Sequence, residues 1–305
     1  MQQLNTLFIK DKKLPIHLEK SPYFEYFMQL YDPWLNTYAQ YDLLMKDFNR
    51  FENFDKWYIN KEQVTKNIKD FILKSQAYSE LNSESIDQKY LIKDNYKFPS
   101  GNVFNKEHVN KNLLSIDMVK ANWQMWNLLG LTDNKGYEEF IKQFQASDYQ
   151  ASSKILRQVL FGEIHPKRIQ KMEKYFTHKV ASALQKSNFK LLTCTADEMV
   201  VELKEGDNVD KIQSIVKQET PQINWRIEYW QLENILEERH WILQKNISNG
   251  QINFRNVPKH FMAQVYKHHM QLPLHENDLL FEHEGIMAKF SSALNFEVKK
   301  RFTPR

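Results

Sequence analysis

The chain has 305 residues, which is enough for one large domain or two small ones with a sizeable hydrophobic core. Hydrophobic residues make up 42% and charged residues 26%, as in ordinary globular proteins, and the net charge of +4 is compatible with nucleic-acid binding. Cys194 is the single cysteine, which excludes a disulfide framework and a cysteine metal cluster. There is neither an apolar run of the roughly 20 residues that span a bilayer nor a signal-peptide pattern. We therefore expect a cytoplasmic protein without a membrane partner.

The first part of the chain is predicted to be mostly helical. Residues 1–60 are rich in aromatic residues, and one or two short helices broken near Pro33 are expected there. The next elements are expected to be a helix at 64–81, a loop at 83–88 (SESIDQ) and a turn at 98–102.

The middle of the chain is predicted to hold one strand followed by four helices. The segment NLLSID (112–117) has the pattern of a short buried strand that ends at Asp117. The helices are expected at 118–130, closed by Gly130, and at 137–144, 149–161 and 166–185. The last of them is the best defined, because proline stands at its first position and apolar residues recur every three or four positions.

A hairpin and further strands are predicted in the remainder. Two apolar runs between Leu191 and Leu203 flank the acidic tip Ala196-Asp197-Glu198. After the hairpin we expect a helix at 209–219, strands at 223–235, 240–246 and 251–255, and a helix at 258–270. This order predicts an α+β architecture.

Three acidic residues are predicted to meet at one edge of the sheet. Asp117 ends one strand, and Asp197 and Glu198 lie at the hairpin tip, with Asp197 80 residues further along the chain. Neighbouring carboxylates repel each other and favour divalent cations, and two Mg²⁺ (or Mn²⁺) ions held by two aspartates form the site of two-metal nucleotidyl transfer. We therefore predict Asp117 and Asp197 as metal ligands, and these two with Glu198 as catalytic residues. The alternative is that Asp117 caps a helix and that the tip is an ordinary acidic turn.

The seven glycines are too widely spaced for a P-loop or a dinucleotide-binding fingerprint. Phosphate groups, if the protein handles them, would therefore be bound by metal ions and basic side chains.

Three segments resemble, in order, the sequence motifs of family A DNA polymerases. SIDMVKANWQMWNLLG (115–130) is similar to motif A, SKILRQVLFG (153–162) to the motif B helix, and KLLTCTADEMVVELKEGDNVDKIQSIVKQE (190–219) to motif C with its helix. The similarity covers roughly residues 95–220. It implies a palm-like antiparallel sheet with helices packed on one face and reduced helical fingers.

The resemblance also implies a division into regions. These are a mostly helical N-terminal region at 1–90, a palm at 91–220 with a short fingers insertion at about 131–165, and strands with a helix at 221–305 that complete the palm or form a reduced thumb.

A nucleotide-binding role for five residues follows from the same resemblance. Lys154 and Arg157 would contact the triphosphate, and Phe161 would stack on the incoming base, although each of these residues could equally be ordinary surface or core. Asn122 and His165 stand where the family has a sugar-screening glutamate and a tyrosine, so the preference between deoxyribose and ribose is left open.

The function implied is that of a small template-directed, DNA polymerase-like enzyme that adds nucleotides to a primer 3′-hydroxyl. Its partners would be a primer–template, nucleoside triphosphates and replication proteins, and its size would suit DNA replication of a virus or mobile element, in the host cytoplasm. Four basic residues of the helix at 166–185 would touch the phosphate backbone, or form a solvated face: Lys167, Arg168, Lys171 and Lys174.

Two alternatives belong to other functional classes. A catalytically inactive, nucleic-acid-binding palm is favoured by the departures from the family pattern at Ser153, His165 and Pro166. A palm-fold nucleotidyl cyclase is suggested by TADEMVVEL, which superficially resembles the Gly-Gly-Asp-Glu-Phe hairpin of diguanylate cyclases but has Ala196 before the aspartate and lacks both glycines.

Overall fold

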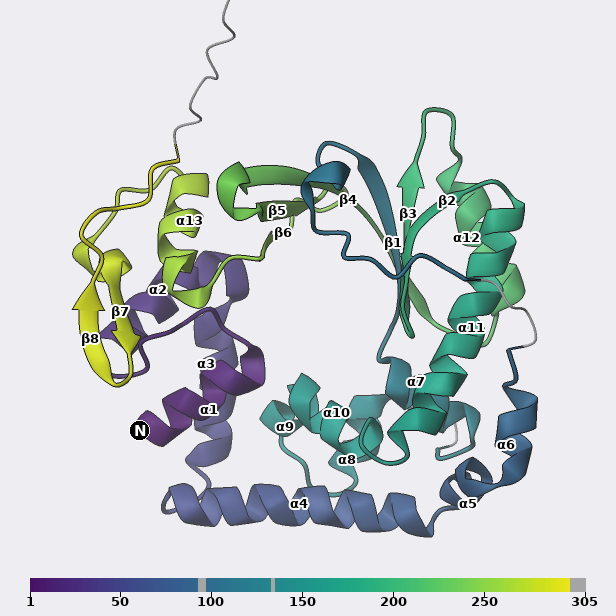
Figure 1. The fold of residues 1–305 in the computed structure, drawn as a ribbon. Helices are drawn as coiled ribbons and strands as arrows, with labels where there is room; N and C mark the ends of the chain where they lie inside the picture. Colours follow the sequence, from purple (N-terminus) through teal and green to yellow (C-terminus); the bar gives the residue numbers. More distant parts are fainter. Residues whose placement is uncertain (93–96, 133–134, 297–305) are drawn as a thin grey trace, which may run out of the picture.

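The computed structural model describes residues 1–92, 97–132 and 135–296. Its centre is a six-stranded antiparallel sheet with the strand order β2-β3-β1-β4-β5-β6, with helices α11 (Pro166–Lys186) and α12 (Val209–Glu219) along one face and further helices below the sheet and beyond its β5–β6 end (Figure 1). The strands are β1 (Asn112–Met118), β2 (Lys190–Cys194), β3 (Glu198–Leu203), β4 (Trp225–Leu236), β5 (Trp241–Asn246) and β6 (Ile252–Arg255). The predicted α+β class is confirmed.

The N-terminal part is helical, as expected, but its boundaries differ from the prediction. The helices are α1 (Gln2–Lys12), α2 (Tyr23–Leu35), α3 (Thr37–Phe48), α4 (Phe54–Lys74), α5 (Gln76–Asn82) and α6 (Glu84–Lys89). Pro33 lies inside α2, and the chain turns instead at Asn36, which has a left-handed φ of 51°. Asparagine tolerates this conformation better than most residues, so the break falls there.

The prediction of a loop at SESIDQ is wrong. Helix α6 forms in this segment, with Ser83 at its N-cap position and Glu84 and Asp87 in its first turn. Ile86 is fully buried and packs in the core with residues of α4 and α7 (Ala121–Leu128). Burial of this single apolar side chain outweighs the polar composition that suggested a loop.

The helices between β1 and β4 largely follow the prediction. They are α7, α8 (Tyr137–Lys142), α9 (Asp148–Ser152), α10 (Lys154–Phe161), α11 (Pro166–Lys186) and α12 (Val209–Glu219). The helix expected at 149–161 is divided in two at Ser153. Its backbone is extended, and its hydroxyl accepts a hydrogen bond from the Leu156 N–H at 3.1 Å, which caps α10.

The two faces of the sheet are covered differently. Helices α11 and α12 pack on one face, where Val180 and Leu184 meet Leu114 and Ile116 of β1 (Figure 1). On the other face Val103, from the segment before β1, packs with Trp230 of β4. Side chains alternate along a strand, so Asp117 and its cross-strand partners lie on this second face.

The two ends of the chain share one core. Phe27 and Tyr31 of α2 pack in the same cluster as Trp241 of β5 and Tyr266 of α13 (Met262–His269).

An unpredicted hairpin follows α13, made of β7 (Leu280–His283) and β8 (Ile286–Lys289). The short 3-10 helices are Lys106–His108, Glu237–Arg239, Lys259–Phe261 and Glu276–Leu279.

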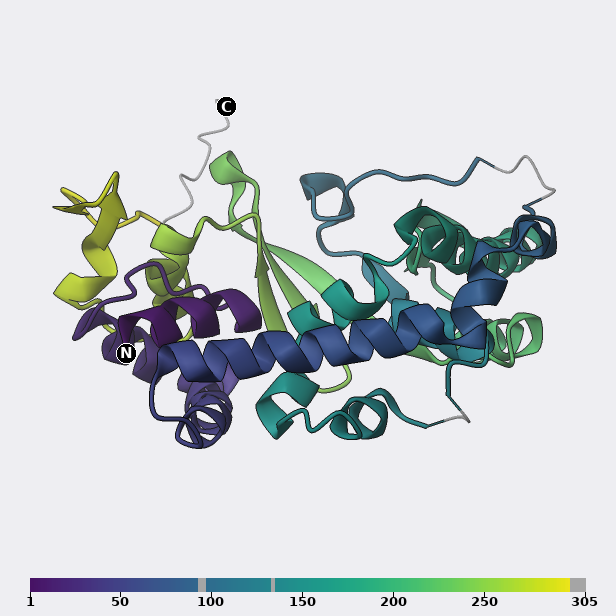
Figure 2. The same cartoon turned by 90° about the horizontal axis from the view of Figure 1, so that it is seen from below.

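The second and third expected regions share one sheet, and all three contribute to a common core. The strands β4–β6 extend the sheet that β1–β3 begin, and the N-terminal helices pack against the C-terminal end. Helix α4 connects the two cores, because Trp57 lies in the core just described while Ile68 and Ile72 lie in the core around α7 and α10. Figure 2 shows α4 running across the molecule beneath the sheet.

Among the described residues, no helix has both the length and the apolar character needed to cross a membrane.

Candidate active site

The predicted meeting of Asp117 with the acidic hairpin tip is found. Strand β3 pairs with β1 in the register that places Glu198 opposite Asp117. One step further, the Met118 N–H donates a hydrogen bond to the Asp197 carbonyl oxygen at 2.8 Å. These backbone contacts bring together residues that are 80 positions apart.

The hairpin tip is held by hydrogen bonds within the turn and by one from helix α11. The Thr195 N–H donates to the Glu198 carbonyl oxygen at 2.7 Å, and the Glu198 N–H donates to the Thr195 hydroxyl at 3.1 Å. Thr177 of α11 donates its hydroxyl proton to the Ala196 carbonyl oxygen at 2.7 Å. Helix α11 therefore anchors the backbone of the turn that carries Asp197.

Asp117 carries a charge that its surroundings disfavour. Burial raises the pKa of its carboxyl to about 6; the Arg226 guanidinium opposes this shift, and the charges of Glu198 and Asp197 add to it. Its side chain is 24% exposed, so solvent screening is incomplete. At neutral pH the site therefore places an ionised Asp117 beside two further carboxylates. A divalent cation bound here would reduce the repulsion between these groups.

A polar network surrounds these carboxylates on the same face of the sheet. The Ser115 hydroxyl donates to Glu198 Oε1 at 2.7 Å. Arg226 of β4, directly opposite Asp117, contacts Asp117 Oδ2 through Nη2 at 2.7 Å and Glu228 Oε2 through Nε at 3.2 Å. Arg226 was not among the predicted site residues.

A second missed residue is Glu173 of α11. Its side chain is only 9% exposed, and burial together with the charge of Asp197 raises the pKa of its carboxyl to about 8. Among the residues that the structure describes, no hydrogen bond or ion pair reaches this carboxylate. The signal was present in the sequence, because Glu173 interrupts the apolar face formed by Ile169, Met172 and Phe176.

We expect Glu173→Gln to stabilise the protein in alkaline solution and to have little effect in acid. The folded protein keeps the Glu173 proton up to about pH 8, whereas the unfolded chain loses it near the ordinary value of 4.5. The folded state thus binds more protons between these values, so wild-type stability falls as pH rises through this window. Glutamine does not ionise and so avoids this loss of stability. The variant should therefore be more stable than the wild type at about pH 9 by on the order of 3 kcal/mol.

Urea unfolding of both proteins at about pH 5 and about pH 9 measures this difference. Other titrating groups, Asp117 included, contribute to both proteins and cancel to first order. An equal stability difference at the two pH values would show that Glu173 does not keep its proton in the folded state.

The residues predicted to bind the nucleotide are not in contact with the carboxylates. Phe161 is fully buried, its ring packed edge-on against Trp123 and Tyr137, a placement that speaks against stacking on a base. The Arg157 guanidinium also lies over the Tyr137 ring, 5.6 Å from its centroid, and burial lowers its pKa. Lys154 is exposed at the start of α10.

Asn122 and His165 occupy structural positions. The Asn122 amide packs against Gly162 at the end of α10, where a Cβ atom would lie 2.6 Å from Asn122 Nδ2 and 2.7 Å from the Gln158 carbonyl oxygen. His165 is exposed, with a left-handed φ of 52°, at the N-cap of α11, and its ring lies near that of Tyr78.

The predicted nucleotide-binding residues are not bonded to the two aspartates. Within the described ranges, no hydrogen bond or ion pair joins Asp117 or Asp197 to any of these four residues: Asn122, Lys154, Arg157 and His165.

The four basic residues predicted to contact a phosphate backbone divide into two pairs. Arg168 and Lys171 bind Asp87 of α6, at 3.2 and 2.8 Å, which commits their charges to an internal contact. Lys167 and Lys174 are exposed on α11. The prediction of a phosphate contact is compatible with the placement of this second pair.

The carboxylates are of the ligand type that Mg²⁺ prefers, but they are too few to complete its coordination shell. Magnesium prefers oxygen ligands, and it is commonly held by one or two carboxylates together with water and substrate phosphates. Asp117 and Asp197 supply two such groups. Over the described part of the chain, no three His, Cys, Asp or Glu side chains are grouped so that they could hold a metal ion. A cation here would therefore need oxygen atoms from a substrate or water to complete its shell.

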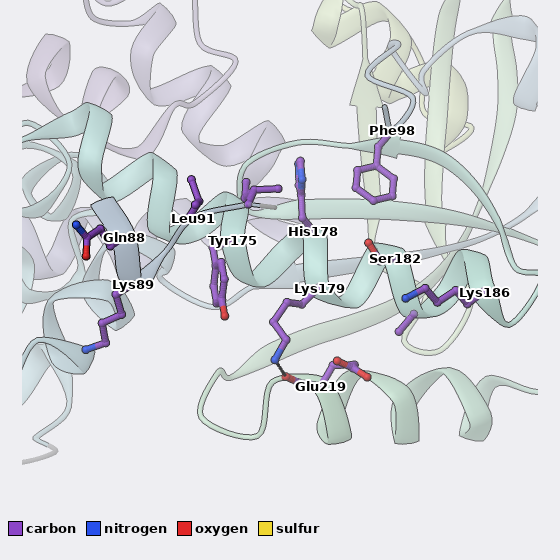
Figure 3. A pocket seen from close by; sticks show the side chains of 12 residues that line it. Gln88, Lys89, Leu91, Phe98, Tyr175, His178, Lys179, Ser182, Lys186 and Glu219 are labelled. Carbon is purple, nitrogen blue, oxygen red and sulfur yellow. Dashed lines mark hydrogen bonds between the residues drawn. The ribbon is translucent and has the colours of Figure 1, made fainter. Parts of the chain in front are cut away.

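A pocket of about 580 Å³ lies elsewhere, on the outer side of α11 (Figure 3). Tyr175, His178 and Lys179 of α11 line it with Phe98 and with Glu219 of α12. None of the predicted site residues belongs to its walls.

Comparisons with known proteins return no relative: no family model, no curated protein and no solved structure matches this chain.

Proposed function

We propose that this chain is a small template-directed nucleic-acid polymerase that adds nucleotides to a primer 3′-hydroxyl. The observation that supports the proposal is the meeting of Asp117, on β1, with Asp197, in the turn that leads into the paired strand β3, so that acidic residues are concentrated at one partly buried place. Both residues lie in segments that resemble family A polymerase motifs, and those segments occur in the family order.

In this proposal Asp117 and Asp197 hold Mg²⁺ or Mn²⁺, which when bound activates the attacking hydroxyl and neutralises the leaving pyrophosphate. Glu198, oriented by the Ser115 hydroxyl, adds negative charge beside both aspartates. Thr177 holds the backbone of the hairpin tip at the Ala196 carbonyl oxygen, next to Asp197. Such pre-organisation is what a charged catalytic site requires.

Arg157 is the strongest candidate for a triphosphate contact. Its Nε atom is buried and has no hydrogen-bond partner among the described residues. A buried donor without a partner costs free energy, and a phosphate oxygen would satisfy it. Lys154, one turn earlier on the exposed side of α10, would add a second positive charge.

Primer extension tests this function. A labelled primer–template is incubated with the protein and Mg²⁺ or Mn²⁺, with dNTPs and NTPs in parallel, and Asp197→Asn serves as the inactive control. We expect template-dependent extension by the wild type that is lost in the variant, and the preferred substrate identifies the sugar. Template-independent dinucleotide formation would instead identify a cyclase.

Two observations favour a second function, nucleic-acid binding without catalysis. Phe161 is buried in the core, and Arg226 already neutralises Asp117. A folded protein that binds DNA with steep salt dependence, but extends no primer with either metal, would support this alternative and exclude the enzyme.

A further inference from the structure

Arg226 makes a contact that competes with a metal ion. Its Nη2 atom lies 2.7 Å from Asp117 Oδ2, one of the oxygen atoms that a divalent cation would need. The pairing is built into the sheet, since Arg226 stands directly opposite Asp117 in the β1–β4 register. Both residues project from the same face, so the ion pair forms without distortion of either strand.

Arg226 also has a second acceptor, Glu228, which lies two positions further along β4 and opposite Ser115 of β1. Its Nε atom contacts Glu228 Oε2 at 3.2 Å, and Asn246 of β5 donates a hydrogen bond to the other oxygen of Glu228 at 3.3 Å. Glu228 is therefore held in place independently of Arg226. The guanidinium side chain is 58% exposed, which leaves it room to move between the two carboxylates.

We propose that Arg226 is the resident counter-ion of Asp117, which a divalent cation displaces onto Glu228. The inference rests on the proposed function, because it presumes that Asp117 is a metal ligand. In the metal-free protein, Arg226 balances the charge of Asp117. When a cation binds, the Arg226 guanidinium releases Asp117 and pairs with Glu228 alone, so that it does not remain beside the metal. Arg226 thus sets the cation concentration at which the site is filled.

An arginine is suited to this exchange. Its planar guanidinium presents several N–H donors, so it contacts two carboxylates at once and keeps one contact when the other breaks.

Direct Mn²⁺ binding tests the proposal without any measurement of activity. Free Mn²⁺ is counted by electron paramagnetic resonance at about pH 8.5, so that Asp117, with a pKa of about 6, is ionised. We expect Arg226→Gln to bind Mn²⁺ about fivefold more tightly than the wild type, because removal of a competing ion pair of this exposure is worth about 1 kcal/mol. Arg50→Gln, which removes the same charge from a pair with Asp47 on α3, should leave the affinity unchanged.

A double-mutant cycle tests the role of Glu228. Glu228→Gln should weaken Mn²⁺ binding in the wild type but have little effect in Arg226→Gln, because the displaced guanidinium is then absent. An equal loss in both backgrounds would overturn the transfer onto Glu228. Circular dichroism checks that each variant is folded.

The outcomes separate this inference from the proposed function. If the wild type and Arg226→Gln bind Mn²⁺ equally, and Asp117→Asn abolishes the binding, Arg226 is not a competitor, although the metal site stands. If Mn²⁺ binding is absent, or persists in Asp117→Asn, both the metal site and the counter-ion role are overturned.

Discussion

Replacement of Asp117 by asparagine is expected to lower nucleotide incorporation by about a thousandfold or more, without loss of stability. An amide is a poor ligand for Mg²⁺ compared with a carboxylate. A thousandfold loss of rate corresponds to about 4 kcal/mol of lost transition-state stabilisation. The fold should tolerate the change because Asn carries no charge. Burial disfavours the ionised form of Asp117, as its pKa of about 6 indicates.

Single-nucleotide incorporation and urea unfolding, both at about pH 8, measure the two halves of this prediction. Glu205→Gln is a suitable control, because it removes one negative charge from an exposed residue in the turn after β3. We expect this control to keep full activity. If Asp117→Asn retains activity within about tenfold of the wild type, Asp117 does not hold a catalytic metal.

The second large effect concerns stability, at the buried ion pair that joins the ends of the chain. Asp278 is fully buried, and its Oδ2 atom lies 2.8 Å from Lys267 Nζ. Tyr26 of α2 donates its hydroxyl proton to Asp278 Oδ1 at 2.6 Å, and the His275 N–H donates to Oδ2 at 2.7 Å. The carboxylate therefore links α2 with α13 and with the segment that precedes β7.

We expect Asp278→Asn to lower the free energy of unfolding by about 3–5 kcal/mol. The variant leaves the Lys267 ammonium, whose side chain is 9% exposed, without its charge partner. The cost of an uncompensated buried charge exceeds what the pair itself contributes. Urea unfolding at neutral pH measures the loss.

Two controls make this result specific. Asp148→Asn breaks an ion pair with Lys142 whose side chains are 70% and 52% exposed, and because water screens this pair we expect stability close to that of the wild type. Lys267→Met combined with Asp278→Leu removes both charges, and we expect it to recover most of the stability lost in the single variant. A loss below about 1 kcal/mol in Asp278→Asn would mean that the pair is solvated.

The candidate site could be predicted from sequence only in its acidic part. Strand β1 is mostly apolar before Asp117, its last residue but one, and the β2–β3 hairpin has its acidic residues between two apolar runs. Both patterns are local, so they locate carboxylates at strand ends. The alternation of Arg226 and Glu228 along β4 shows that they share a face, but not which residue they meet. That depends on the β1–β4 register.

The sequence by itself determined the elements whose signals lie within one segment, such as α11 with its proline start and the hairpin around Asp197. Tertiary structure alone decided the environment of each side chain. It buried Phe161 among aromatic rings, placed Glu173 beside Asp197, and joined α2 to α13. The physical reason is range. Periodicity and capping depend on residues a few positions apart, whereas burial, charge pairing and strand register depend on neighbours that are remote in the chain.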